Sequence, residues 1–176
     1  MSQTMSLRAR IAVLAGLAAR TASRTLGKGD GGMVGGRVAL KLDPDILASL
    51  TRDKRVVLVT GTNGKSTTTK MTVAALSTVG KVAANLGGDN MGPGITTAAM
   101  KGAHAPFAVF EVDEMHLPAI AAETRPDVMV LLNLSRDQLD RVGEIGAVEK
   151  RLRSAVEENP GAAIVANCDD PLIVSA

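Results

Sequence analysis

Short runs of apolar and β-branched residues alternate with longer segments of helical periodicity along most of the chain. The runs predict strands at residues 56–60, 81–84, 107–112, 128–134 and 163–167. Helical patterns occupy residues 7–26, 66–79, 117–123 and 145–158, and Pro44 opens a further short helix. In the helix at 66–79, Met71, Ala74, Ala75 and Leu76 are expected to face inward. Alternation of this kind predicts right-handed crossovers and a mostly parallel sheet with helices on both faces, a three-layer α/β fold.

The first 54 residues differ in pattern from the rest. A helix dotted with arginines comes first, residues 27–36 are rich in glycine and are predicted to form a linker, and the short helix follows. The sequence therefore predicts an N-terminal segment, residues 1–54, before a domain at residues 55–176. The apolar stretch 11–19 is far shorter than the roughly 20 residues that span a bilayer. We expect the first helix to dock on the domain or to lie at a membrane surface.

Composition narrows the possible functions. The 176 residues, 45% of them hydrophobic, are enough for one principal core, but two Phe and no Trp or Tyr leave few platforms on which single-stranded nucleic acid could stack. A nucleic-acid partner is therefore not expected. Cys168 is the single cysteine, which fits a reducing, cytoplasmic compartment. Residues 1–55 carry ten Lys and Arg against four Asp. This basic arm fits phosphates or an anionic membrane surface, and equally a solvated helix face.

The strongest chemical signal is a phosphate-binding loop between the first long strand and its helix. Residues 61–66 read Gly-Thr-Asn-Gly-Lys-Ser, the shortened form of the motif, since Val59 stands where the longer form has a glycine. Glycines let backbone amides approach phosphates at a helix N-terminus. Lys65 is expected to reach the β- and γ-phosphates of ATP, and the Ser66 hydroxyl to bind Mg²⁺. The motif favours a P-loop NTPase-like version of the three-layer fold.

Polar residues follow each predicted strand, where ligands gather in parallel sheets. Glu111 ends an otherwise apolar strand, so a partner such as Mg²⁺ is expected; the alternative is a carboxylate bonded to backbone amides. Asn90, in a glycine-rich loop, offers a donor and an acceptor for an adenine edge.

Together these segments resemble the central ATPase domain of the Mur ligases, which join amino acids to peptidoglycan precursors. The resemblance runs from about residue 39 to residue 171 and rests on five ordered motifs, at 59–68, 88–92, 110–114, 133–141 and 167–171. Within this family the chain is most similar to the Mur-ligase-like subunits of lipid II isoglutaminyl synthases. Three features favour this: residues 35–42 in place of a UDP-binding domain, the Glu-Val-Asp-Glu at 111–114, and Gln138. Most amino-acid-adding members have a histidine where Gln138 stands, and that histidine is a ligand for a second Mg²⁺. The resemblance therefore does not decide whether this chain has a second metal site.

The resemblance implies a function and a set of roles. ATP would phosphorylate the D-glutamate carboxylate of lipid II, and ammonia from a GatD-type glutaminase subunit would then attack the acyl phosphate. Lys65 and Glu111 would be catalytic, and Ser66 and Glu111 would hold Mg²⁺. The expected nucleotide-binding residues are Thr62, Asn63, Gly64, Lys65, Ser66, Thr67 and Asn90. Location in the cytoplasm, with peripheral contact to the inner membrane surface, is expected.

Relatives of this type continue through a zinc ribbon and a C-terminal domain. The chain ends at Ala176, so the resemblance implies the N-terminal part of a Mur ligase, truncated and inactive alone, with Zn²⁺ expected only beyond this chain's end. Two alternatives stay open: an amino-acid-adding Mur or folylpolyglutamate-type ligase, and a non-catalytic nucleotide-binding module.

Overall fold

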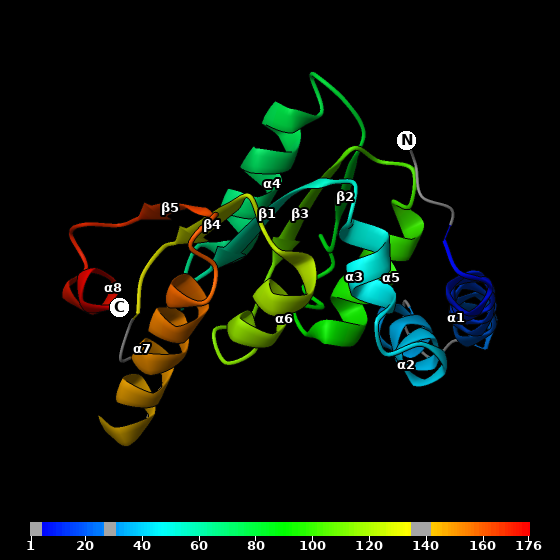
Figure 1. Cartoon of the computed structure of the whole chain (residues 1–176), viewed down its shortest axis with the longest axis horizontal. Coiled ribbons are helices and arrows are strands. Elements are labelled where there is room, and N and C mark those ends of the chain that lie inside the picture. Colours follow the sequence, from blue (N-terminus) through cyan, green and yellow to red (C-terminus); the bar gives the residue numbers. More distant parts are fainter. Residues whose placement is uncertain (1–4, 27–30, 135–141) are drawn as a thin grey trace.

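A computed structural model describes residues 5–26, 31–134 and 142–176. Within these residues five strands form one parallel sheet in the order β2-β3-β1-β4-β5 (Figure 1). The strands are β1 (Arg55–Thr60), β2 (Val82–Ala84), β3 (Phe107–Glu111), β4 (Val128–Leu131) and β5 (Ala163–Ala166). The predicted fold class is confirmed. Among the described residues, none of the helices combines the length and apolar content needed to cross a bilayer.

Helices lie on both faces of the sheet. They are α1 (Leu7–Thr25), α2 (Gly32–Leu42), α3 (Ile46–Thr51), α4 (Lys65–Leu76), α5 (Gly92–Lys101), α6 (Leu117–Thr124), α7 (Val142–Glu157) and α8 (Pro171–Ser175). Figure 1 shows α4 on one face of the sheet and α3, α5, α6 and α7 on the other. The main core lies on the second face, where Leu58, Phe110 and Met129 are buried. Because side chains alternate along a strand, Val59 and Glu111 point to the face of α4.

The glycine-rich stretch predicted as a linker becomes helical at Gly32. Helix α2 packs between α1 and α5, and its glycines lie where backbones touch. A Cβ on Gly35 would stand 2.9 Å from the carbonyl oxygen of Gly16, and a Cβ on Gly36 would stand 2.5 Å from the carbonyl carbon of Pro93. The sequence prediction was wrong here because close packing outweighs the low helix propensity of glycine.

The expected inward face of α4 was also wrong. Thr69 is buried, whereas Met71, Ala74 and Ala75 are exposed and Leu76 is half-buried. Helix α4 packs on β1, β2 and β3, while β5 is exposed along its length. Helix α5, which sequence patterns did not predict, begins where the glycine loop at residues 87–94 was expected to continue.

Glu123 of α6 gives a testable consequence for stability. Its Oε2 is buried without a hydrogen-bond partner in the described structure. Burial, and secondarily the charge of Asp45, raise its pKa above the ordinary value of 4.5. The folded state therefore binds the proton more tightly than the unfolded state, so stability is full below the unfolded pKa and falls as pH rises through the folded pKa.

We expect Glu123→Gln to raise the free energy of unfolding by about 1 kcal/mol at neutral pH, because the neutral amide removes a charge that burial and Asp45 disfavour. The gain should disappear as pH falls toward 4.5. Urea unfolding across this pH range measures both quantities, with the exposed Glu157→Gln as the control. A gain that is the same at both ends of the range would contradict the prediction.

Candidate active site

The loop between β1 and α4 has the backbone geometry of an anion site. Gly61 has φ +134° and Gly64 has φ +87°, conformations that favour glycine. A Cβ on Gly61 would stand 2.9 Å from the backbone nitrogen of Asn133, so glycine is also needed for space. The loop leads directly into the N-terminus of α4, where the helix dipole and free amide groups attract negative charge.

The side chain of Lys65 is held at this loop by backbone carbonyls of the loop and by an acidic neighbour. Its Nζ donates to the carbonyl oxygens of Gly61 and Thr62, and lies 3.4 Å from Oε1 of Glu114. The side chains of Lys65 and Glu114 are 15% and 14% exposed. Sequence analysis did not assign Glu114 to the site. Its place three residues after Glu111 is the signal that could have found it.

Ser66 and Glu111 meet at the edge of the sheet where the strands have their carboxyl ends, which we call the rim. The Ser66 hydroxyl donates to Oε2 of Glu111 over 2.7 Å, and Glu111 is only 5% exposed. A carboxylate and a hydroxyl at this separation suit Mg²⁺, which takes one or two protein oxygens and completes its shell with phosphate oxygens and water. The donor pair therefore fits the expected metal, which would also neutralise charge on phosphoryl oxygens when bound.

Asn85 fixes the backbone of Glu111. Its Oδ1 accepts from the Glu111 amide over 2.9 Å, and its Nδ2 donates to the Glu111 carbonyl over 2.8 Å and to the Asp89 carbonyl over 3.0 Å. The segment after β2 is thereby tied to the end of β3. Asn90 lies in this segment, and its carbonyl accepts from the Asp113 amide. Its predicted contact with adenine stays a prediction.

Asn133 is a positioning residue that sequence analysis missed. Its carbonyl accepts from the Thr62 amide over 2.8 Å, its Oδ1 accepts from the Asn63 amide over 2.9 Å, and its Nδ2 donates to the Asn63 carbonyl over 2.9 Å. These bonds join the phosphate loop to the end of β4. The signal was available, since Asn133 opens the motif after the fourth predicted strand.

The fold places the expected site residues as follows. Thr62, Asn63 and Gly64 lie in the loop after β1, and Lys65, Ser66 and Thr67 form the first turn of α4. Glu111 is the last residue of β3, which neighbours β1, and Asn90 lies between β2 and α5. Gln138 lies outside the described residues. At the same rim Asp170 caps α8 and accepts from the Leu134 amide over 2.8 Å, so it supports the chain just after Asn133.

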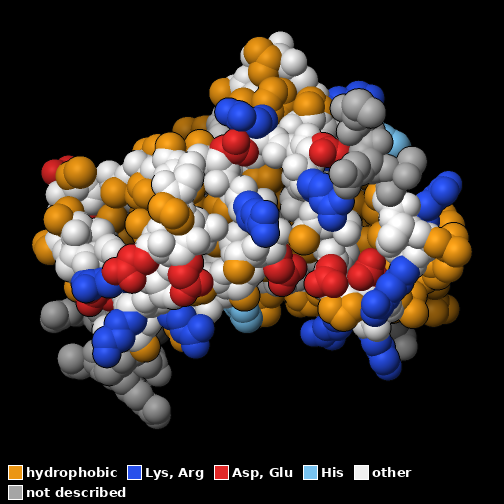
Figure 2. Space-filling view, in the orientation of Figure 1, with side chains coloured by type: hydrophobic (Ala, Val, Ile, Leu, Met, Phe, Trp, Pro, Cys, Tyr) orange, Lys and Arg blue, Asp and Glu red, His pale blue; other side chains and the backbone are white. Residues whose placement is uncertain are grey.

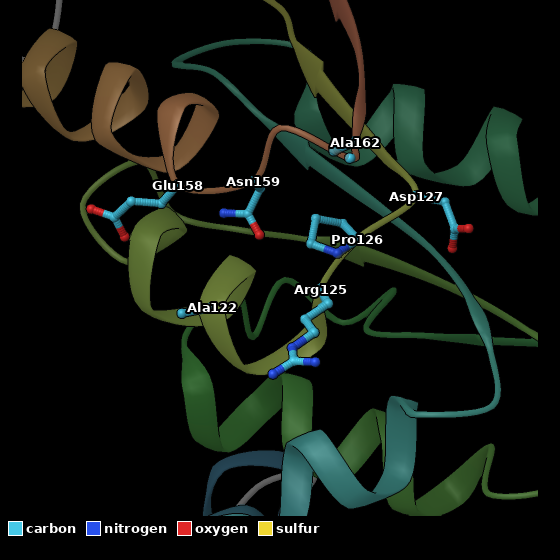
Figure 3. A pocket seen from close by; sticks show the side chains of 8 residues that line it. Ala122, Arg125, Pro126, Asp127, Glu158, Asn159 and Ala162 are labelled. Atoms are coloured by element: carbon cyan, nitrogen blue, oxygen red, sulfur yellow. The ribbon is translucent and has the colours of Figure 1, made fainter.

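A separate pocket lies at the opposite end of the strands, before β4 and β5. Its volume is about 520 Å³, and its lining comprises Ala122, Arg125, Pro126, Asp127, Glu158, Asn159, Gly161 and Ala162. Figure 3 shows Arg125 pointing away from Asp127. Asp127 instead accepts from the Val56 amide over 2.7 Å and pairs with Arg55. Asp127 thus serves the fold, and the rim at the phosphate loop is the better candidate for chemistry.

Comparison with known proteins identifies the family of the chain. The model of the Mur ligase middle domain matches residues 59–175, which include the phosphate loop, Glu111 and Asn133. The chain belongs to the Mur ligase family. The Mur ligase resemblance predicted from the five motifs is confirmed.

Several Mur ligase relatives are similar in sequence. The chain is 38% identical over 173 residues to subunit MurT of the lipid II isoglutaminyl synthase (glutamine-hydrolyzing) of Streptococcus pneumoniae, which covers 96% of this chain and 38% of that protein. It is 36% identical over 159 residues to MurT of Staphylococcus aureus strain COL, covering 88% and 36%. It is also 36% identical over 135 residues to UDP-N-acetylmuramate–L-alanine ligase of Mycolicibacterium vanbaalenii, covering 76% and 27%. The chain spans a little over a third of the length of the two MurT proteins.

Solved Mur ligase structures share the fold. MurF from Acinetobacter baumannii matches with a TM-score of 0.63 at 21% identity, over 78% of this chain and 31% of that one. MurF from Thermotoga maritima, solved in complex with ADP, matches with a TM-score of 0.52 at 24% identity, over 70% and 30%.

Proposed function

We propose that this chain carries the ATP site of a ligase that amidates lipid II during peptidoglycan synthesis. The observation that carries the proposal is the convergence of Lys65, Ser66 and Glu111 at one phosphate loop, with Ser66 Oγ and Glu111 Oε2 2.7 Å apart. This arrangement suits a phosphate chain and a divalent cation better than a free carboxylate or a base. The ADP bound to the Thermotoga maritima relative supports a nucleotide as ligand.

The proposed reaction has two steps. A substrate carboxylate attacks the γ-phosphorus of ATP, and ADP leaves, which gives an acyl phosphate. Ammonia then attacks the acyl carbon, the bond to phosphate breaks, and the departing phosphate takes up the proton that the nitrogen loses. Lys65 and the N-terminus of α4 stabilise the negative charge of the phosphoryl group in transfer. Ser66 and Glu111 hold Mg²⁺, and Asn133 and Asn85 keep the loop and Glu111 in place.

The proposed acceptor is the D-glutamate carboxylate in the lipid II stem peptide, and the proposed source of ammonia is a GatD-type glutaminase subunit. The names of the two MurT relatives, subunits of a glutamine-hydrolysing lipid II isoglutaminyl synthase, support both assignments. Because ATP and lipid-linked precursors meet on the inner side of the membrane, we place the protein in the cytoplasm at the membrane face.

An amino-acid-adding ligase is the second candidate, because an L-alanine-adding relative is 36% identical. One experiment separates the two. The chain, as part of the longer ligase that the resemblance implies and together with its glutaminase subunit, is given ATP, Mg²⁺ and lipid II. ADP release is followed with either ammonium or an amino acid as the amine.

We expect ADP release and amidated lipid II with ammonium or glutamine, and a hydroxamate when hydroxylamine traps the acyl phosphate. Product formation with an amino acid but not with ammonium would establish the second candidate. ATP binding without turnover under either condition would indicate a non-catalytic nucleotide-binding module.

A further inference from the structure

The outer face of α1 is apolar, which is unusual for a surface helix. Leu7, Ile11 and Leu14 are 73%, 52% and 69% exposed. Their spacing of four and three residues places them in one stripe along the helix. The opposite face is buried and consists of small residues, namely Ala9, Ala12, Gly16 and Ser23.

Close packing explains why the small residues face inward. A Cβ on Gly16 would stand 2.8 Å from the carbonyl oxygen of Gly35, so α1 and α2 touch at their backbones. Large side chains have no room at that contact and point outward. Three large apolar side chains grouped on one exposed face cost free energy in water and are typical of a binding surface.

The charge around this stripe indicates what it binds. Helix α1 contains four arginines and no acidic residue. Arg10 is exposed beside the stripe, and Arg37 and Lys41 are exposed on α2, which packs against α1. Arg8 is held by the protein itself, through the carbonyl of Leu42 over 2.8 Å. Figure 2 shows orange side chains gathered at the end of the molecule where α1 lies, with blue side chains next to them.

We propose that the outer face of α1 binds an anionic lipid surface, with the helix lying in the plane of the interface. An exposed apolar stripe on a helix whose charged residues are all arginines is the pattern of helices that lie at membrane surfaces. Each basic residue near an anionic leaflet adds attraction to it. An apolar stripe alone would suit a second copy of the chain equally well, but an excess of arginines on both copies would repel. The inference deepens the proposed membrane-face location.

Vesicle co-sedimentation tests this surface without nucleotide or lipid II, so failure here leaves the ligase proposal standing. We expect the protein to bind vesicles of phosphatidylcholine mixed with phosphatidylglycerol and to bind phosphatidylcholine alone much less. Leu14→Glu should weaken binding about tenfold or more, since it removes a leucine that the lipid would cover and adds a charge that the anionic surface repels. Arg10→Gln should weaken it by a smaller factor that shrinks with added salt.

Val79→Glu is the matched control, because Val79 is 71% exposed and lies after α4, away from α1. Light scattering on each variant reports the oligomeric state. Equal binding by Leu14→Glu and Val79→Glu, or equal binding to charged and neutral vesicles, would overturn the proposal. So would a dimer that Leu14→Glu converts to a monomer, since the stripe would then belong to a contact between two copies.

Discussion

Replacing Lys65 by methionine should weaken ATP binding, and in the longer ligase slow turnover strongly, while leaving the fold intact. Methionine keeps most of the side-chain volume but removes the charge that faces the phosphate loop. Charge-assisted hydrogen bonds to phosphate contribute about 1.5–3 kcal/mol, so affinity for ATP with Mg²⁺ should fall roughly 10- to 100-fold. The rate of phosphoryl transfer should fall further, by about 10²–10³, because Lys65 stabilises charge that develops in the transition state.

Binding of a fluorescent ATP analogue and ADP release measure the two effects separately. Lys70→Met is the matched control, since Lys70 is exposed on the same helix and the change in net charge is identical. Glu114 loses its 3.4 Å ion pair in Lys65→Met, so thermal unfolding should be recorded for both variants. If Lys65→Met bound and hydrolysed ATP within about twofold of the unchanged protein, the loop would not be the nucleotide site.

A single methyl group at Gly36 should destabilise the chain more than most surface substitutions. In Gly36→Ala the new Cβ would stand 2.5 Å from the carbonyl carbon of Pro93, and backbone atoms cannot swing aside as a side-chain end can. Helices α2 and α5 must then separate, and we expect a loss of about 3 kcal/mol, at the upper end for overpacking. For a chain of this size the melting temperature should drop by roughly 6–12 °C.

Gly146→Ala, which adds the same methyl group, should raise the melting temperature instead of lowering it. Gly146 also lies within a helix, α7, and a Cβ there meets nothing within 4 Å. Alanine should therefore stabilise the protein by about 0.5–1 kcal/mol through helix propensity alone. Calorimetry on the two variants compares them directly. Similar melting temperatures would mean that α2 and α5 are not in backbone contact.

The strands and the phosphate loop could be predicted because their signals are local. Each strand is a short apolar run, and Gly61, Gly64, Lys65 and Ser66 stand in register between a strand and a helix. Glu111 could be predicted as well, since a carboxylate at the end of an apolar strand needs a partner.

What could not be predicted depends on contacts between segments far apart in the sequence. Helix α2 forms because Gly35 and Gly36 meet Gly16 and Pro93, and no local pattern reports such an approach. Helix α4 packs on the sheet with Thr69 buried, so the larger Met71 faces outward. Hydrophobic periodicity therefore predicted the wrong face of α4 as the buried one. Asn133 lies 70 positions from Asn63, with which it exchanges two hydrogen bonds, and only the fold brings them together.

The glycine contacts among α1, α2 and α5 also have a mechanical consequence. Where two helices touch backbone to backbone, as Gly16 and Gly35 or Gly36 and Pro93 do, no side chain at that point can change rotamer to absorb a shift. The three helices should therefore move together, as one rigid lever. Helix α5 starts next to the segment that Asn85 ties to Glu111, at one end of this lever, and the apolar stripe of α1 lies at the other. A force or tilt applied to α1 would therefore reach the rim of the phosphate site as a rotation of the whole lever.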